Sequence, residues 1–169
     1  MIRLFVLTLI ILNTMSCKVE AIELNRNGFG NLVIGLKQEN VLKELVQKVE
    51  KKTIYGEENF IEYHVVYKGN NLALRFDNNE LYYIELKDSS LKTDINIGIN
   101  DSLALLIKKC SNLGITSGHA EGGYFTGNCN DVMYFFSLEN INSKELDSGK
   151  IESNKENKVR INRIYIIRI

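Results

Sequence analysis

Three apolar stretches joined by short Asn-rich segments constrain the fold of this chain more than any other feature. Residues 61–67 (IEYHVVY), 72–76 (LALRF) and 81–86 (LYYIEL) have the composition and alternation of β-strands, and KGNN and DNNE separate them. Asn and Gly favour the tight turns that join antiparallel neighbours. The pattern therefore predicts an antiparallel meander of three strands over residues 61–86.

A strand–turn–helix pattern precedes this meander and occurs a second time later in the chain. Residues 30–46 (GNLVIGLKQENVLKELV) and 95–110 (INIGINDSLALLIKKC) each combine a short alternating strand with an amphipathic helix. The tight turns fall at Gly35 and Asn100, two residue types that tolerate a left-handed backbone. The apolar stripes of the two helices are expected to be Val41, Leu42, Leu45, Val46 and Val49 in the first, and Leu103, Leu106, Ile107 and Cys110 in the second. Asp101 or Ser102 is expected to cap the second helix.

More strands follow the second helix. They are expected at residues 123–126, 132–138 and 159–169, with the polar segment 139–158 as a surface loop or, alternatively, a weak interaction segment. We therefore predict an α+β domain built from two loosely repeated helix-plus-antiparallel-meander units, with the helices on one face of the sheet. The two halves would cover about residues 22–90 and 91–169 of a single domain, 22–169.

The first 21 residues have the pattern of an export signal. Arg3 supplies a positive charge, and residues 4–12 (LFVLTLIIL) form an apolar stretch too short to span a bilayer. Val-Glu-Ala predicts cleavage after Ala21, which would release a soluble periplasmic protein. Ser-Cys offers a lipobox instead, in which Cys17 would be lipidated and the product would be an outer-membrane lipoprotein. We favour cleavage after Ala21 because strand-like sequence follows directly, without a polar tether. The remaining alternative is a buried N-terminal strand or helix of a cytosolic protein.

Either cleavage leaves two cysteines, Cys110 and Cys129, in the folded domain. In an oxidising compartment such a pair forms a disulfide more often than not. A metal site needs more ligands than these cysteines and the two histidines, His64 and His119, provide in any recognisable spacing. The sequence therefore predicts a disulfide, no metal and no cofactor.

The charge balance and the motif content argue against nucleic-acid binding and catalysis. The chain carries 21 Lys and Arg against 21 Asp and Glu, so it has no basic footprint for nucleic acid or for an anionic membrane. No phosphate-binding loop, nucleophile elbow or zinc-protease motif is present. Glu57, Glu58 and Asp77 are interpreted as turn and rim residues rather than as a glycosidase carboxylate pair. We therefore expect a protein that is not an enzyme.

A polar loop is the best candidate for partner binding. Residues 111–128 are expected to be held by the disulfide, and the candidate contacts within them are Ser117, His119, Glu121 and Tyr124. A hydroxyl, an imidazole and a carboxylate this close in sequence cannot easily converge on one reacting atom, so binding is favoured over catalysis. Tyrosines on several expected strands give further support, because Tyr is enriched at interface hot spots.

Part of the sequence resembles a known family. The segment T-x-x-N-I-x-I-N-D-S-L, Cys110, a Gly-rich turn, Cys129 and the terminal I-x-x-I-Y-I are similar to the enterobacterial sigma-E-regulated envelope lipoprotein family. The resemblance covers about half of the domain and departs from the family at Asn96 and Asn100, where Gly would be usual. It implies export and a cysteine pair, but no assigned activity. The opening N-G-x-G-x-L-x-I-G also resembles small periplasmic immunity proteins and inhibitors.

Together these features predict an exported, non-enzymatic binding protein. The leading hypothesis is a periplasmic immunity or inhibitor protein that blocks a toxin or a cell-wall hydrolase through residues 111–128 and the neighbouring strand edges. Its partner would be a protein, and it would contact a membrane only through a lipid on Cys17. The alternative hypothesis is a structural lipoprotein of the envelope stress response.

Overall fold

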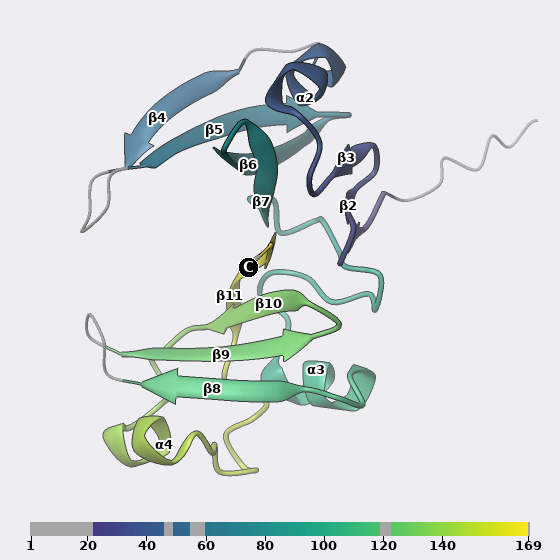
Figure 1. The fold of residues 1–169 in the computed structure, drawn as a ribbon. Helices are drawn as coiled ribbons and strands as arrows, with labels where there is room; N and C mark the ends of the chain where they lie inside the picture. The colour runs from purple at the N-terminus through teal and green to yellow at the C-terminus, as the bar shows by residue number, and fades with distance from the viewer. Residues whose placement is uncertain (1–21, 46–48, 55–59, 119–122, 169) are drawn as a thin grey trace, which may run out of the picture.

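The computed structural model describes residues 22–45, 49–54, 60–118 and 123–168. Its main element is an eight-stranded sheet in which all neighbouring strands are antiparallel. The strands are β4 (Glu50–Ile54), β5 (Phe60–Tyr67), β6 (Asn70–Asp77), β7 (Glu80–Leu86), β8 (Gly114–Gly118), β9 (Tyr124–Cys129), β10 (Val132–Phe136) and β11 (Ile161–Ile167). Their order is β4-β5-β6-β7-β11-β10-β9-β8, so β7 and β11 join two groups of four strands (Figure 1).

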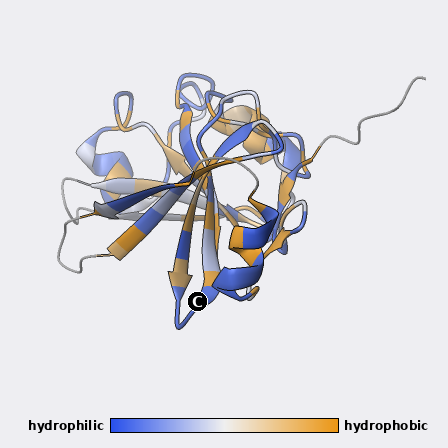
Figure 2. Cartoon of the chain, turned by 90° about the horizontal axis from the view of Figure 1, so that it is seen from above, coloured by the Kyte–Doolittle hydropathy of each residue, from blue (hydrophilic) through white to orange (hydrophobic). Residues whose placement is uncertain are grey.

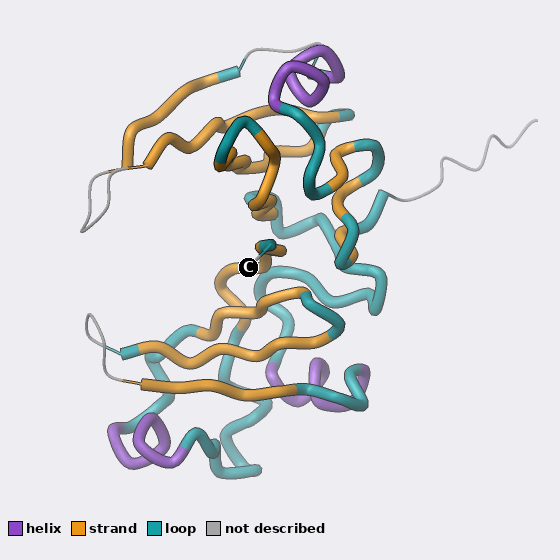
Figure 3. The backbone as a smooth tube through the Cα atoms, in the orientation of Figure 1, coloured by secondary structure: helices purple, strands orange, loops and turns teal. Residues whose placement is uncertain are grey.

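A small sheet and three short helices complete the described part of the chain. The small sheet comprises β1 (Leu24–Asn25), β2 (Gly28–Phe29) and β3 (Leu32–Val33); the helices are α2 (Gln38–Glu44), α3 (Leu103–Lys109) and α4 (Ser143–Ser148). Figure 3 shows how much of the chain is strand and how little is helix. The α+β prediction is thus confirmed in its coarse form, with β-structure dominant. That the halves 22–90 and 91–169 repeat one unit, with their helices on one face, stays a prediction.

Two-residue turns close three hairpins of the large sheet. At each turn both central residues have positive φ, the backbone required when two residues connect twisted antiparallel strands. The pairs are Lys68 and Gly69, Asn78 and Asn79, and Asn130 and Asp131. The predicted hairpin turns within KGNN and DNNE are therefore confirmed. Gly35 and Asn100 also take the left-handed backbone expected of them, with φ of 90° and 72°.

The hydrophobic core lies between one face of the sheet and the first two helices. Val41 of α2 and Leu106 of α3 are fully buried in the same cluster as Ile84 of β7 and Ile164 of β11. Hydrophobic and hydrophilic residues alternate along the strands, as Figure 2 shows. A strand directs alternate side chains to opposite faces, so the hydrophobic residues cover one side of the sheet. We call this side the core face and the opposite side the open face.

Helix α3 begins as expected but buries a narrower stripe. The Ser102 hydroxyl accepts a hydrogen bond from the Leu105 backbone N–H at 3.2 Å, which makes Ser102 the cap. Asp101 instead accepts the Gly98 N–H at 2.7 Å and pairs with Lys92. The prediction that Ile107 belongs to the buried stripe is wrong, since its exposed fraction is 41%. A helix of two turns contacts the core only along one narrow face, and the side chain of Ile107 lies beside that face.

Two expected loops contain regular structure. Within 139–158, Asn142 accepts the Glu145 N–H at 2.9 Å and Glu145 accepts the Asn142 N–H at 3.0 Å, a capping box that starts α4. Residues 111–128, expected to be a disulfide-held loop that leads into a strand at 123–126, contain most of β9, which agrees with that strand, and also β8, which was not expected. The expectation of a loop is wrong at α4 and at β8, because short-range caps and strand pairing order segments that show little apolar periodicity.

Strand β4 was not expected either. Its sequence, EKKTI, is largely charged, and it lies at one end of the sheet. Charged side chains on an end strand discourage pairing with other chains, but they also remove the apolar alternation by which a strand is recognised. No helix in the part of the chain described above is long and apolar enough to cross a membrane.

Candidate functional site

Two buried carboxylates lie at the centre of the open face, and each is held by an arginine. Glu62 of β5 and Glu85 of β7 have exposed fractions of 4% and 2%. The Arg75 Nε and Nη2 atoms lie 2.9 Å and 2.8 Å from Glu62 Oε2. The Arg163 Nε and Nη2 atoms donate to the two oxygens of Glu85 at 2.9 Å and 3.3 Å. Charge-assisted bonds of this kind are the strong ones, so both arginines have fixed positions.

The environment of Glu85 favours its ionised form. Burial alone would raise the pKa of Glu85, but hydrogen bonds from Arg163 and Lys87 outweigh burial and hold this pKa below the ordinary carboxyl value. Tyr83 is a third residue that donates to Glu85, through its hydroxyl at 2.8 Å. Burial, followed by the negative charge of Glu85, raises the pKa of Tyr83, so its phenol keeps its proton and remains a donor.

Aromatic rings pack against both guanidinium groups. The Arg75 guanidinium carbon lies 3.8 Å from the ring centre of Phe60 and 4.2 Å from that of Tyr83. The Arg163 guanidinium lies 5.6 Å and 5.8 Å from the ring centres of Phe135 and Tyr165. Both sets of distances fall within the range of cation–π attraction. We call the set of Phe60, Glu62, Arg75, Tyr83, Glu85, Phe135, Arg163 and Tyr165 the arginine–aromatic cluster.

His64 lies next to this cluster. Its Nε2 atom is 2.9 Å from Glu62 Oε1, yet it makes no hydrogen bond of acceptable geometry within the described residues. The ring is half-buried. It borders a pocket of about 450 Å³ that also contains Glu50, Lys87 and Asn71. This pocket presents both positive and negative groups.

A larger pocket, of about 800 Å³, lies on the other half of the open face. Its walls come from β8, β9, β10 and β11, and it is lined by Thr116, Gly123, Tyr124, Phe125, Thr126, Met133, Phe135, Phe136, Ser137, Leu138, Asn162 and Arg163. We call it the Arg163 pocket. A β-bulge borders it: Phe135 pairs with Arg163 and Phe136 with Ile161, so Asn162 is an extra residue on β11. Bulges disrupt the ladder locally and redirect side chains, which opens space beside the sheet.

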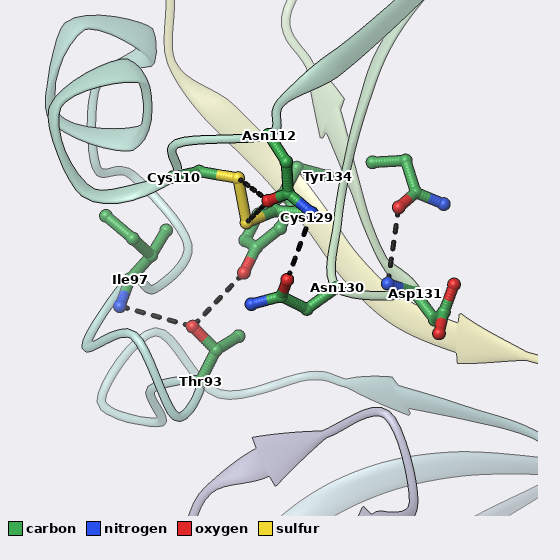
Figure 4. Close-up of a disulfide and its surroundings, with 9 residues drawn as sticks. Thr93, Ile97, Cys110, Asn112, Cys129, Asn130, Asp131 and Tyr134 are labelled. Atoms are coloured by element: carbon green, nitrogen blue, oxygen red, sulfur yellow. Dashed lines mark hydrogen bonds between the residues drawn. A yellow bond between two sulfur atoms is a disulfide. The ribbon is translucent and has the colours of Figure 1, made fainter.

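The predicted disulfide is confirmed. Cys110 and Cys129 are joined, with their Cα atoms 6.1 Å apart, and connect the end of α3 to the end of β9. The Asn112 side-chain oxygen lies 3.3 Å from one sulfur and 3.8 Å from the other, as Figure 4 shows. A disulfide sulfur has no proton, so these are polar contacts rather than hydrogen bonds. Asn112 also donates to the Asn130 side-chain oxygen at 3.3 Å, which links the cystine to the β9–β10 turn.

A third pocket adjoins the disulfide and is strongly polar. It has a volume of about 580 Å³ and is lined by Asn25, Arg26, Asn27, Asp94, Asn112, Asn128, Asn130 and Asp131. Amide side chains dominate this lining. Among the described residues, no group of three His, Cys, Asp or Glu side chains is arranged to hold a metal ion.

The structure separates the candidate contacts that the sequence placed in one loop. Ser117 lies on β8, and its hydroxyl donates to the Leu146 carbonyl oxygen at 2.6 Å, so it attaches α4 to the sheet. Tyr124 begins β9 and borders the Arg163 pocket. His119 and Glu121 lie outside the described residues, as does Cys17. Of the four candidates, Tyr124 is therefore the one whose described surroundings form a cavity.

Sequence reasoning missed the arginine–aromatic cluster. Its charged members lie on strands at positions that alternate with apolar residues, where a charge is usually assigned to a solvated face. One signal was available: Glu62 and Glu85 fall within strands of the expected meander, where a buried carboxylate needs a partner. Arg75 lies opposite Glu62 in the register of the β5–β6 hairpin, whereas Arg163 is 78 residues from Glu85, and no local pattern specifies that second pairing.

Comparisons with known proteins bear on the fold alone. No protein-family model matches the chain, and no curated protein matches its sequence. The structure is similar to the crystal structure of the uncharacterized protein YfeY from Escherichia coli, with a TM-score of 0.58 and 14% sequence identity. The alignment covers 86% of this chain and 99% of that one. The chain therefore shares its fold with an uncharacterised protein of Escherichia coli.

Proposed function

We propose that this chain is an exported, non-enzymatic binding protein that receives a protein partner on the open face of its sheet. The observation that carries the proposal is the arginine–aromatic cluster at the centre of this face. Arg163 and Tyr165 are half-buried there, and no described helix covers the face between β5 and β9 (Figure 1). Tyr and Arg are the residues most enriched at interface hot spots.

The fixed geometry of the cluster supports this role. An exposed arginine normally loses side-chain freedom when it binds a partner, and this loss weakens the complex. Arg163 already makes two hydrogen bonds to Glu85 and one to Tyr83, at 3.1 Å, in the free protein. The side chain of Arg163 has therefore lost most of its conformational freedom before a partner binds. A surface prepared in this way is suited to tight, specific recognition.

The charges of the cluster indicate the chemistry of the partner. Arg75, Arg163 and the adjacent Lys87 provide three cations against the two carboxylates Glu62 and Glu85. A complementary surface would combine acidic groups with apolar side chains that pack on the rings. A toxin or a cell-wall hydrolase remains our proposed partner, and the periplasm the proposed compartment. These assignments extend the expectation from the sequence.

The mirrored strand order supports the predicted repeat of two units. The last strand of each group contains one extra residue relative to its neighbour, Tyr82 in β7 and Asn162 in β11. These two bulged strands pair with each other at the centre of the sheet. We propose that the halves are related units and that the binding face is formed where they meet.

A pull-down with surface variants tests the proposed function. The tagged full-length chain, expressed and exported in its host, is used to retain periplasmic proteins or secreted toxins, which mass spectrometry then identifies. Tyr165→Ser removes a half-buried ring from the open face, and Ile107→Ser is the matched control on α3. Retention of one toxin or hydrolase that is lost with Tyr165→Ser and kept with Ile107→Ser supports the proposal. Retention that is insensitive to Tyr165→Ser contradicts it.

A further inference from the structure

We infer that the Arg163 pocket is a binding site for a small amphipathic carboxylate, a molecule with one acidic head and an apolar chain. This inference concerns a small ligand and does not depend on the proposed protein partner. The volume of about 800 Å³ lies within the roughly 300–1,000 Å³ that small-molecule sites occupy. The lining has the composition of such sites, mainly apolar and aromatic side chains with a few polar groups.

The charge of the pocket selects an anion. Among the described residues that line it, Arg163 is the only charged one, and none carries a carboxylate. The other two pockets differ in this respect. The polar pocket beside the disulfide combines Arg26 with Asp94 and Asp131, and the pocket at His64 combines Lys87 with Glu50. The carboxylate that pairs with Arg163, Glu85, is buried and is not among the lining residues, so the charged group that faces a ligand here is the cation.

The guanidinium of Arg163 has one nitrogen available for a ligand. Its Nε atom donates to Glu85, and its Nη2 atom donates to both Glu85 and the Tyr83 hydroxyl. Nη1 has no hydrogen-bond partner among the residues that the structure describes. A guanidinium carries five N–H donors in a fixed fork, so the two N–H groups of Nη1 can still bind a carboxylate. Glu85 thus positions the cation without occupying the donors that a ligand needs.

The remaining walls suit the apolar chain of the ligand. Met133, Phe135 and Leu138 are half-buried and border the pocket, so each presents apolar surface that a ligand can cover. Met is adaptable in shape and makes favourable contacts with varied apolar groups. The bulge at Asn162, near the start of β11, interrupts the regular pairing with β10 beside the pocket. A linear aliphatic monocarboxylate combines these requirements, and decanoate is a suitable probe.

Methyl NMR of the full chain provides a direct test. The chain has three methionines, Met1, Met15 and Met133, and Met133 is the one that lies among the described residues, where it borders the pocket. With ¹³C-methyl methionine, decanoate is expected to shift the Met133 signal in a saturable way. Decanol, which has the same chain without the charge, is expected to bind about tenfold to a hundredfold more weakly. An unshifted Met133 signal, or equal affinity for decanol and decanoate, would overturn the inference.

Matched variants assign the role of Arg163. Arg163→Gln is expected to weaken decanoate binding about tenfold or more. The control variant is Arg168→Gln. Arg168 is exposed, follows directly after β11 and pairs with Glu80, so this variant is expected to leave decanoate binding unchanged. Thr116→Trp fills the pocket from an exposed position of β8, and it is expected to abolish the Met133 shift with little change in the melting temperature. Because Thr116→Trp leaves Arg163 in place, it tests the site even if Arg163→Gln fails to fold. Equal effects of the two arginine variants, or an undiminished shift in Thr116→Trp, would contradict the assignment.

Discussion

Arg163 on β11 binds Glu85 on β7 through two hydrogen bonds, across the pair of strands that joins the two groups of four in the sheet. The carboxylate is almost fully buried, whereas the side chain of Arg163 is 44% exposed. One partner of the pair therefore belongs to the interior and the other faces solvent. This asymmetry explains how the same contact can stabilise the fold and present a cation to a ligand.

Replacing Glu85 is expected to destabilise the protein. Glu85→Gln keeps the shape of the side chain but removes the charge that pairs with Arg163 and Lys87. Breaking a fully buried ion pair costs about 3–5 kcal/mol, and the partial exposure of both cations reduces this to about 2 kcal/mol. Urea denaturation measures the change in the free energy of unfolding. Glu80→Gln is the matched control, because Glu80 and Arg168 are both exposed and their pair should contribute less than about 0.5 kcal/mol. Equal losses in the two variants would show that the burial of Glu85 is unimportant.

Stability is expected to fall in acid. The folded-state pKa of Glu85 lies below the ordinary value of 4.5, because hydrogen bonds from Arg163 and Lys87 outweigh the opposing effect of burial. Asp101 shifts in the same direction, with Lys92 and the Gly98 N–H outweighing burial. The unfolded chain then binds more protons than the folded one below pH 4.5, so the stabilisation is complete above that value and lost as the pH falls through the folded-state pKa values. Unfolding free energies between neutral pH and about pH 3 test this, and Glu85→Gln should show a shallower decline. A flat profile would contradict the prediction.

Loss of the disulfide is expected to be costly. Cys110 and Cys129 are 19 residues apart, and closing a loop of this length stabilises a fold by roughly 3 kcal/mol through the entropy of the unfolded chain. The Cys110→Ser, Cys129→Ser double variant should therefore unfold at a lower urea concentration. Wild-type protein under reducing conditions should give the same midpoint, because both samples lack the same cross-link. A midpoint of the double variant equal to that of the oxidised protein would exclude a stabilising role.

Tyr134 is expected to report on burial through its titration. Its hydroxyl lies 3.2 Å from the Thr93 hydroxyl inside the core, and burial raises the pKa of Tyr134 to about 12 (Figure 4). Since the unfolded phenol loses its proton near pH 10.0, stability should decline as the pH rises from 10.0 towards 12. Tyr134→Phe should reduce this alkaline decline and cost about 1 kcal/mol near neutral pH, where only the hydrogen bond is lost. Alkaline and neutral urea titrations separate the two effects, and a Tyr134→Phe variant with unchanged alkaline behaviour would contradict the assignment.

Local sequence patterns were sufficient to predict the hairpins and the cystine. The turns that contain Asn78 and Asn79 and Gly69 follow from residue types that accept positive φ. The cap at Ser102 follows from the same short-range chemistry. Such features depend on neighbours within a few residues. They can therefore be read without knowledge of the tertiary structure.

Features at the ends of the sheet and in α4 were not predicted because their sequences carry weak periodic signals. Strand β8 has glycine at both ends and only two β-forming residues between, yet five pairs with β9 order it. The capping box of Asn142 and Glu145 was readable in principle. The charge-rich sequence around it favoured a loop instead, since six helical residues contain too few apolar positions to show a stripe.

The sequence by itself determined the turns and strands of the meander over residues 61–86, the cap of the second helix and the pairing of the two cysteines, because the turns, strands and cap depend on local conformational preference and on the period of apolar residues. Only the tertiary structure decided that Glu85 and Arg163 meet on the open face. Arg163 reaches Glu85 because β11 returns to pair with β7, 78 residues away in the chain. A contact over that separation is fixed by the order and register of strands, and no pattern in either strand specifies its partner.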